Sequence, residues 1–181
     1  MYTEPMKMRL RDGRRVILRS AEPEDAAADL RCMRQCAAET EFLLLSPEDV
    51  GDDVPRHAAA LEAVRDDPYQ LLLICVAQGE VVGRLHGFLK PRVKLQHRYR
   101  LGLCVRRDHW GQRLATAMLH TAERVAREMG CTQAEVEVMA HNRRAVRLYE
   151  REGFRIAMVH PQAVRFPDGR VADEYLMIKR L

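Results

Sequence analysis

Residues 101–115, with the sequence LGLCVRRDHWGQRLA, combine a strand pattern, a tight turn and a helix pattern. Apolar residues alternate up to Val105, Trp110 and Gly111 mark a polar turn, and a helical repeat begins at Leu114. The first turn of a helix carries backbone N–H groups without helical acceptors, and the helix dipole favours an anion there. The stretch therefore predicts a phosphate-binding turn, although an ordinary strand-to-helix connection fits the same pattern.

A phenol and an amide stand in a second stretch, around a short helix predicted over residues 143–152. Asn142 precedes this helix, where a side-chain oxygen can cap the first turn. Tyr149 carries a phenol whose unperturbed pKa is about 10, so it keeps its proton at neutral pH and could act as a general acid. The alternative is structural, with Asn142 as a helix cap and Tyr149 as an aromatic anchor.

Together the two stretches resemble the signatures of the GNAT superfamily of N-acetyltransferases. Residues 110–115, Trp-Gly-Gln-Arg-Leu-Ala, are similar to its acetyl-CoA pyrophosphate loop, Gln/Arg-x-x-Gly-x-Gly/Ala. Residues 136–154 are similar to its second signature, with Asn142, Tyr149 and Gly153-Phe154 at the family's spacing. Arg113 departs from the pattern, because the family has glycine there. We expect Arg113 to adopt the right-handed geometry of a helix first turn, so that cofactor binding survives.

The resemblance implies an enzyme that moves an acetyl group from the cosubstrate acetyl-CoA to the primary amine of a small molecule, directly, in a ternary complex. A protein N-terminus, as in enzymes that acetylate ribosomal proteins, is the alternative acceptor, and a non-catalytic CoA-binding or regulatory module is the other alternative. Tyr149 would protonate the departing CoA thiolate. The implied cofactor-binding residues are Leu103, Cys104, Val105, Trp110, Gly111, Gln112, Arg113, Leu114, Ala115 and Asn142.

Two further features of the resemblance concern the acceptor. Many family members use a glutamate on the central strand as the base, but residues 99–105 hold no carboxylate. The candidates for the proton acceptor are Glu137, His97, His86, Asp173 and Glu41. Asp173 is favoured, because residues 169–177 resemble a bacterial subgroup ending G-x-x-x-D-x-x-x-M, and Glu41 and Phe42 should border the acceptor. A covalent acetyl-enzyme on Cys104 is an alternative to direct transfer.

Composition sets outer bounds on these readings. With 181 residues, 47% of them apolar, the chain predicts a single domain over residues 1–181. The net charge of +4 is spread along the sequence, so no nucleic-acid partner is expected. The five cysteines show no disulfide or zinc spacing, so reduced thiols and no metal are expected. Neither a signal peptide nor a membrane span is readable, which favours the cytoplasm, and a homodimer would be common among similar proteins.

Periodicity predicts the elements that hold these residues. Strands are predicted at residues 14–20, 69–77, 81–89, 99–105 and 134–138, with a closing hairpin of residues 154–166 and 171–181. Helices are predicted from Pro23, around residues 59–64, from Leu114 to Met129, and at 143–152. This order predicts an α/β (α+β) class. The resemblance implies the GNAT fold, a central mixed, mostly antiparallel sheet of about seven strands, with helices on both faces and a splay between the fourth and fifth strands.

Overall fold

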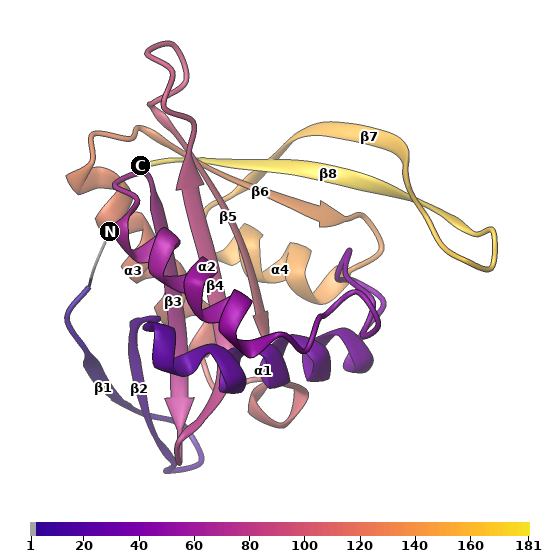
Figure 1. Cartoon of the computed structure of the whole chain (residues 1–181). Coiled ribbons are helices and arrows are strands. Elements are labelled where there is room, and N and C mark those ends of the chain that lie inside the picture. The colour runs from indigo at the N-terminus through magenta and orange to yellow at the C-terminus, as the bar shows by residue number, and fades with distance from the viewer. Residues whose placement is uncertain (1–2) are drawn as a thin grey trace. The chain divides into compact units, whose positions relative to one another are not determined.

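The computed structural model describes residues 3–181 and contains one sheet of eight strands in the order β1-β2-β3-β4-β5-β6-β8-β7 (Figure 1). Strands β5 and β6 run parallel, whereas the pairs β1–β2, β2–β3, β3–β4, β6–β8 and β7–β8 are antiparallel. The predicted α/β (α+β) class with a mostly antiparallel sheet is confirmed.

Within the described residues the chain forms two compact units. The first comprises residues 3–88 and 103–122, and the second comprises residues 89–102 and 123–181. The elements of the first unit are β1 (Met6–Arg9), β2 (Arg15–Ser20), α1 (Ala26–Glu39), α2 (Val54–Asp66), β3 (Gln70–Ala77), most of β4 (Glu80–Leu89), the end of β5 (Arg98–Val105) and the first part of α3 (Leu114–Glu128). The second unit holds β6 (Gln133–Met139), α4 (Arg143–Arg151), β7 (Arg155–Arg165) and β8 (Val171–Arg180).

The core of the first unit lies on both faces of β3, as its unbroken apolar run predicts. Residues 71–75 of this strand are all at most 5% exposed. On one face, Leu72 and Ile74 pack with residues of α1 and α2. On the other face, the backbone of Gly83 approaches Met118 of α3, whose Cε lies 3.5 Å from the position of a Cβ at that glycine. Helices therefore cover both faces of this part of the sheet.

A β-bulge in β4 decides which of its residues face α1. Val81 pairs with Val76 and Gly83 pairs with Cys75, so Val82 is the additional residue. The carbonyl of Val82 accepts a hydrogen bond of 3.0 Å from the backbone N–H of Arg106. The bulge shifts the alternation of side chains by one residue. As a result Arg84, His86 and Phe88 face the same side of the sheet as Ile74 and Leu72. A Cβ at Gly83 would lie 3.3 Å from the carbonyl oxygen of Cys104, so a larger residue there would need a local shift of the neighbouring backbone.

Two elements differ from the sequence-based expectation. The sheet has eight strands rather than about seven, because β1 forms a hairpin with β2 that hydrophobic periodicity does not reveal: all four of its side chains are at least partly exposed. Pro23 lies in a separate 3-10 turn, Pro23–Asp25, and α1 begins after it at Ala26. The five cysteines are free thiols, as predicted. Among the described helices, none is both long enough and apolar enough to cross a bilayer.

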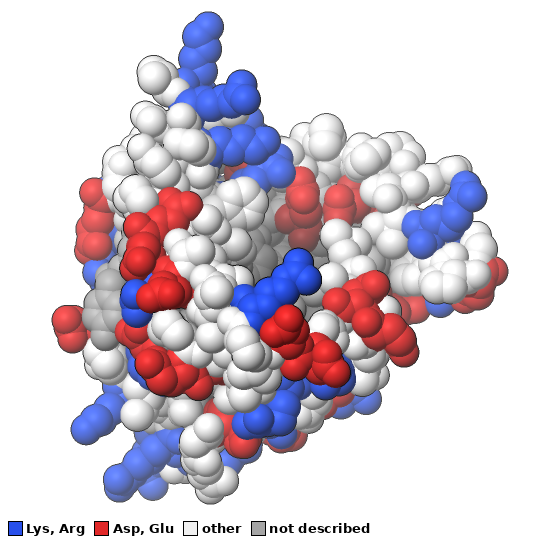
Figure 2. Space-filling view, in the orientation of Figure 1, with Lys and Arg blue, Asp and Glu red and all other residues white. Residues whose placement is uncertain are grey.

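In the second unit, β6 and β8 form the centre and the β7–β8 hairpin continues beyond β6 (Figure 1). Val171 and Ala172 of β8 pair with β7 beyond the last β6 pairing, and the carbonyl of Asp173 accepts a hydrogen bond of 2.8 Å from Ala140 N. The segment between β4 and β5 exposes Lys90, Arg92 and Lys94, and Figure 2 shows basic side chains gathered over it.

A buried carboxylate joins β5 to β6 in this unit. Glu135 is 1% exposed and accepts hydrogen bonds from the guanidinium groups of Arg98 and Arg100 and from the Gln133 amide, at 2.6 Å for the last. Burial on its own would raise the pKa of Glu135, but these hydrogen bonds and the two positive charges outweigh it and lower the pKa.

This lowered pKa makes the folding stability depend on pH. A carboxylate with a lower pKa in the folded state contributes stability that is present above its unfolded pKa of about 4.3 and is lost as the pH falls through the folded value. Glu135→Gln should therefore destabilise the protein by about 2 kcal/mol at pH 7. Urea unfolding at pH 7 and at pH 3 checks this, because the difference from the wild type should shrink at the lower pH. A difference that stays constant over this range would contradict it.

Candidate active site

The loop after β5 is anchored to the end of that strand. Leu103, Cys104 and Val105 are its last three residues. The indole Nε1–H of Trp110 donates a hydrogen bond of 2.6 Å to the carbonyl of Val105. The loop therefore returns to the strand that it leaves, which limits the positions that its backbone can take before α3 begins.

A buried histidine in the same loop forms hydrogen bonds to two neighbouring side chains. His109 is 5% exposed, its Nε2 lies 2.7 Å from Nη1 of Arg14, and its Nδ1 lies 2.7 Å from Oδ1 of Asp108. A guanidinium can only donate, so Nε2 must accept and Nδ1–H must donate to Asp108. These contacts place the Nδ1–H of His109 on Asp108 and its Nε2 on Arg14. The Arg14 guanidinium also donates to the carbonyl of Asp108 at 3.0 Å, which ties the β2 end of the sheet to the loop.

The end of α1 contacts the loop through Glu39. Glu39, the last residue of α1, accepts a hydrogen bond of 2.6 Å from the backbone N–H of Arg107, and the Arg107 guanidinium donates to the Glu39 carbonyl. That guanidinium also lies 5.4 Å from the centre of the Trp110 ring, a cation–π contact. Glu41 and Phe42, expected to border the acceptor, follow in the connection after α1; Glu41 is exposed and Phe42 is partly buried.

Arg113 has a left-handed backbone conformation, with φ of 66°, so the expectation of right-handed geometry there is wrong. The first helical hydrogen bond of α3 runs from Ala117 N to Arg113 O, so Arg113 precedes the helix as its cap and does not lie in its first turn. Gly111 also has a positive φ, 75°. The loop therefore has two left-handed residues between the Trp110 anchor and the start of α3.

This conformation predicts a stability difference between two variants of Arg113. Both Arg113→Gly and Arg113→Ala remove the guanidinium, but only glycine adopts a positive φ without a steric cost, so the glycine variant should be more stable by about 1 kcal/mol. Chemical denaturation of both variants measures this directly. The strain is absent if the alanine variant is equally stable. If the guanidinium binds a phosphate, both variants should lose affinity for CoA equally.

The arrangement fits a diphosphate. The backbone N–H groups of Leu114 and Ala115 lie in the first turn of α3, where no helical carbonyl can accept them. Arg113 is exposed, and a Cβ added at Gly111 would meet nothing within 4 Å, so the loop backbone is open to a ligand. The Gln112 side chain is occupied differently, since its Oε1 accepts a hydrogen bond of 3.2 Å from the Asp12 N–H. An anion at this turn would meet backbone donors and the positive end of the helix dipole.

The second unit positions Asn142 and Tyr149 on α4. The Asn142 Oδ1 accepts a hydrogen bond of 3.1 Å from Ala145 N, which confirms its predicted role as the helix cap. Tyr149 is 5% exposed, and its ring contacts Phe154 edge-on at a centroid distance of 5.6 Å. The predicted structural roles of both residues are therefore present, and Asn142 and Tyr149 also carry an amide N–H₂ and a phenol, which are both proton donors by their chemistry.

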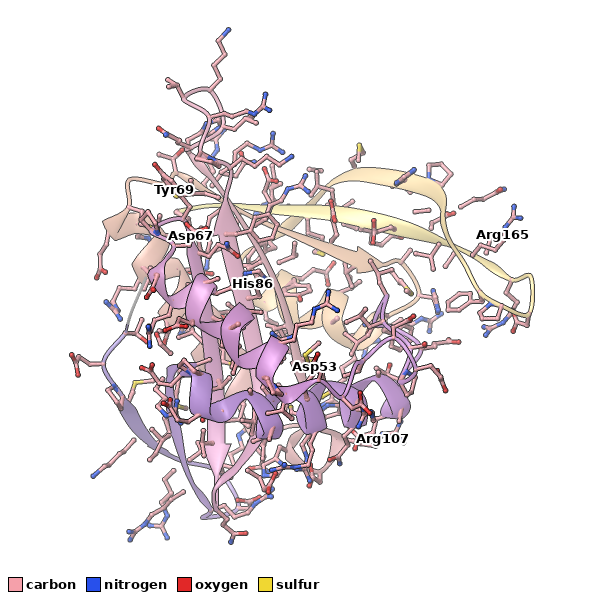
Figure 3. All side chains as sticks on the ribbon, in the orientation of Figure 1. Asp53, Asp67, Tyr69, His86, Arg107 and Arg165 are labelled. Atoms are coloured by element: carbon pink, nitrogen blue, oxygen red, sulfur yellow. The ribbon has the colours of Figure 1, made fainter. Side chains whose placement is uncertain are left out.

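His86 is the candidate proton acceptor on β4 (Figure 3). Its Nε2 lies 2.9 Å from Oε1 of Gln70, and the Gln70 amide donates to Oδ2 of Asp67 at 2.6 Å. Burial lowers the pKa of His86, and the charge of Arg84 adds to this. The ring is therefore neutral at pH 7, with Nε2–H donating to Gln70 and Nδ1 as the accepting nitrogen.

Of the other candidates, His97 and Glu41 are exposed, and Glu137 forms an ion pair of 3.4 Å with Arg100. Asp173 is also exposed, and its Oδ1 accepts a hydrogen bond of 2.8 Å from Gln162 N, a residue with φ of 51° in the irregular part of β7. Sequence reasoning did not single out its neighbour Glu174, which is half-buried. Burial raises the pKa of Glu174, the charge of Glu137 raises it further, and His160 opposes them. Glu174 also pairs across the strands with His160.

Comparisons with known proteins point to one family. The family model described as the acetyltransferase (GNAT) family matches residues 33–154. No curated protein matches the sequence. A GNAT-family acetyltransferase from Streptococcus pneumoniae has a TM-score of 0.86 at 24% identity, covering 92% of this chain and 99% of that one. The structure of yncA from Salmonella typhimurium with acetyl-CoA has a TM-score of 0.78 at 23% identity and coverage of 92% and 94%. A ribosomal-protein-alanine N-acetyltransferase from Brucella melitensis has a TM-score of 0.79 at 22% identity and coverage of 91% and 99%.

Proposed function

Because the chain belongs to the acetyltransferase (GNAT) family, we propose that it transfers an acetyl group from acetyl-CoA to the primary amine of a small molecule. The observation that carries this proposal is the loop before α3, where Gly111 and Arg113 have left-handed backbones and the N–H groups of the first helical turn have no helical acceptor. A diphosphate is the anion that this donor set suits.

Acetyl-CoA supplies an activated thioester, and the residues of this chain bind and orient it. The turn at residues 110–115 holds the diphosphate through backbone N–H groups, and Asn142 hydrogen-bonds the pantetheine arm with its remaining amide protons. Backbone groups of Leu103, Cys104 and Val105 stabilise the charge that develops on the thioester oxygen. Tyr149 donates its phenolic proton to the departing sulfur. Transfer is direct, so no acetyl group is bound to Cys104.

We propose that the two neighbouring carboxylates of β8 differ as acceptors of the amine proton. Asp173 is exposed and already accepts a backbone N–H, whereas Glu174 is half-buried with a raised pKa, which makes it the stronger base. Glu174→Gln should therefore lower kcat/KM at pH 7 by about tenfold, and Asp173→Asn should change it less. Initial rates for this matched pair decide between them. A larger effect of Asp173→Asn would instead identify Asp173, the candidate that the sequence favours, as the base.

Two measurements test the proposed function. Thermal unfolding is followed with acetyl-CoA at about 100 times its dissociation constant, where binding should stabilise the fold by about 2.7 kcal/mol. CoA release is then measured with amino acids, polyamines and short peptides with free N-termini as acceptors. Release with a small amine supports the proposal, and release with the peptides alone assigns the chain to protein N-termini. Stabilisation without release with any acceptor indicates a CoA-binding module, and no stabilisation overturns the proposal.

A further inference from the structure

Arg84 of β4 is paired with a buried carboxylate through one edge of its guanidinium. Its Nε lies 3.1 Å from Oδ1 of Asp29 on α1, an ion pair that does not meet the geometry of a hydrogen bond. Asp29 is 0% exposed, and its other oxygen accepts a hydrogen bond of 3.0 Å from Nε2 of His57 on α2. The carboxylate therefore holds the Nε edge of the guanidinium in place, and His57 holds the carboxylate.

The two terminal nitrogens of Arg84, Nη1 and Nη2, reach solvent. The side chain is 20% exposed, whereas its Nε is buried without a hydrogen-bond acceptor. Within residues 3–181, neither terminal nitrogen donates a hydrogen bond, and neither belongs to the buried polar atoms that are left without a partner. Four of the five N–H donors of the guanidinium are therefore available to a ligand, outside the ion pair with Asp29.

Arg84 lies beside the end of β5, where the proposed function places the thioester. Strands β4 and β5 are neighbours in the sheet, and the carbonyl of Val82 accepts a hydrogen bond of 3.0 Å from the N–H of Arg106. A Cβ at Gly83 would lie 3.3 Å from the carbonyl oxygen of Cys104. The next residue along β4, Arg84, is therefore adjacent to Cys104 on the neighbouring strand.

The Arg84 side chain also lies on the face of the sheet that α1 and α2 cover. It pairs across the strands with Ile74, so the two side chains are on the same face. Cys104 packs against the core cluster that contains Ile74 and Leu72. An amine that attacks a thioester at the end of β5 would thus have a fixed guanidinium near the rest of its molecule.

The free donors of this guanidinium match a planar oxyanion. Two parallel N–H groups bind both oxygens of a carboxylate, and these hydrogen bonds are charge-assisted. Asp29 lies on the Nε edge, so it does not compete for the terminal N–H groups. A diamine or polyamine would instead bring a second cation towards Arg84, and like charges in contact are unfavourable.

We propose that the acceptor is an amino carboxylate, a small primary amine whose carboxylate is bound by the terminal nitrogens of Arg84. This inference rests on the proposed acetyl transfer and narrows the class of its acceptor. Arg84 determines specificity and takes no part in the chemical step. In that step the C–N bond forms, the C–S bond breaks, the amine loses a proton and CoA leaves as the thiol.

Matched acceptors test this on the wild-type chain. CoA release is measured with the L-amino acids, β-alanine and γ-aminobutyrate, each beside its carboxamide, and with diamines of similar length. We expect the best amino carboxylate to have a kcat/KM about tenfold above that of its carboxamide, because hydrogen bonds between charged groups are the stronger ones. Equal values for acid and amide, or turnover with diamines or carboxamides alone, would overturn the proposal and leave acetyl transfer standing.

Variants assign the preference to Arg84. Arg84→Gln should raise the KM for the amino carboxylate about tenfold and leave the KM for acetyl-CoA unchanged. Arg84→Lys keeps a positive charge beside Asp29 but loses the paired donors, so it should raise the same KM, and it tests the point if Arg84→Gln does not fold.

Arg31→Gln is the matched control for these variants. Arg31 of α1 forms an ion pair of 3.1 Å with Glu80, in which the side chains are 56% and 48% exposed, so its removal should change neither KM. A preference for the carboxylate that survives in both Arg84 variants would exclude Arg84 as its source.

Calorimetric titration of the same compounds in the presence of CoA separates this proposal from the proposed function. Binding of an amino carboxylate, but not of its carboxamide, that is lost in Arg84→Gln would support the Arg84 site even without turnover. That result without turnover would contradict acetyl transfer alone. Neither binding nor turnover with any of these compounds would overturn both.

Discussion

Replacing Tyr149 with phenylalanine is expected to lower kcat with the amine acceptor about 100-fold, the lower range for a positioned general acid. Only the hydroxyl is lost. The ring keeps its edge-on contact with Phe154, at 5.6 Å between centroids, so the fold and the KM for acetyl-CoA should stay unchanged. Initial rates of CoA release at saturating acetyl-CoA measure the effect. A split in which kcat falls while KM is constant indicates a group that acts in the transition state.

Tyr99→Phe is the matched control for this experiment. Tyr99 is fully buried on β5, and its hydroxyl has no hydrogen-bond partner among residues 3–181. Burial raises the pKa of Tyr99, with Cys131 contributing, so its phenol does not ionise near neutral pH. Removing this hydroxyl should leave kcat unchanged and stabilise the fold by about 1 kcal/mol. If Tyr149→Phe behaves like Tyr99→Phe in turnover, Tyr149 is an aromatic anchor and not an acid.

Asp29→Ala is expected to destabilise the protein by about 3–5 kcal/mol, because it leaves buried charge without a partner. Asp29 is 0% exposed, and its oxygens lie 3.1 Å from Arg84 Nε and 3.0 Å from His57 Nε2. Both partners are largely buried, so solvent cannot replace the carboxylate. The free energy of unfolding from urea denaturation at pH 7 measures the loss.

Two further variants separate the charge effect from the loss of packing. Asp52→Ala removes an exposed carboxylate from the connection before α2 and should change stability by less than about 0.5 kcal/mol. The double variant Asp29→Ala with Arg84→Met should lose less than Asp29→Ala alone, because the buried cation is removed together with its partner. Equal losses in the single and double variants would mean that the Asp29–Arg84 pair contributes packing and no electrostatic coupling.

Local sequence patterns were sufficient to predict most of the helices and strands. The apolar run of β3 and the helical repeat from Leu114 predict elements whose boundaries depend on nearby residues, and both are confirmed. The Asn142 cap of α4 and the left-handed glycine that ends this helix, Gly153, are local in the same sense. The types and spacing of residues in the loop and around α4 were also sufficient to indicate the family, because both stretches are short and continuous.

Tertiary structure decided the features that depend on distant partners. Arg113 is left-handed in a loop that the Trp110 indole bonds to Val105, and the side on which Arg84 lies follows from the bulge at Val82. Neither the conformation of Arg113 nor the orientation of Arg84 can be predicted from the residues next to it in the sequence.

The same holds for the groups with unusual chemistry. Sequence determined that the chain has carboxylates on the segments that form α1 and β8. It could not show that Asp29 pairs with Arg84, or that Glu174 is more buried than Asp173. Hydrogen bonds and desolvation depend on distances of a few ångströms between segments remote in the chain, and only folding sets those distances.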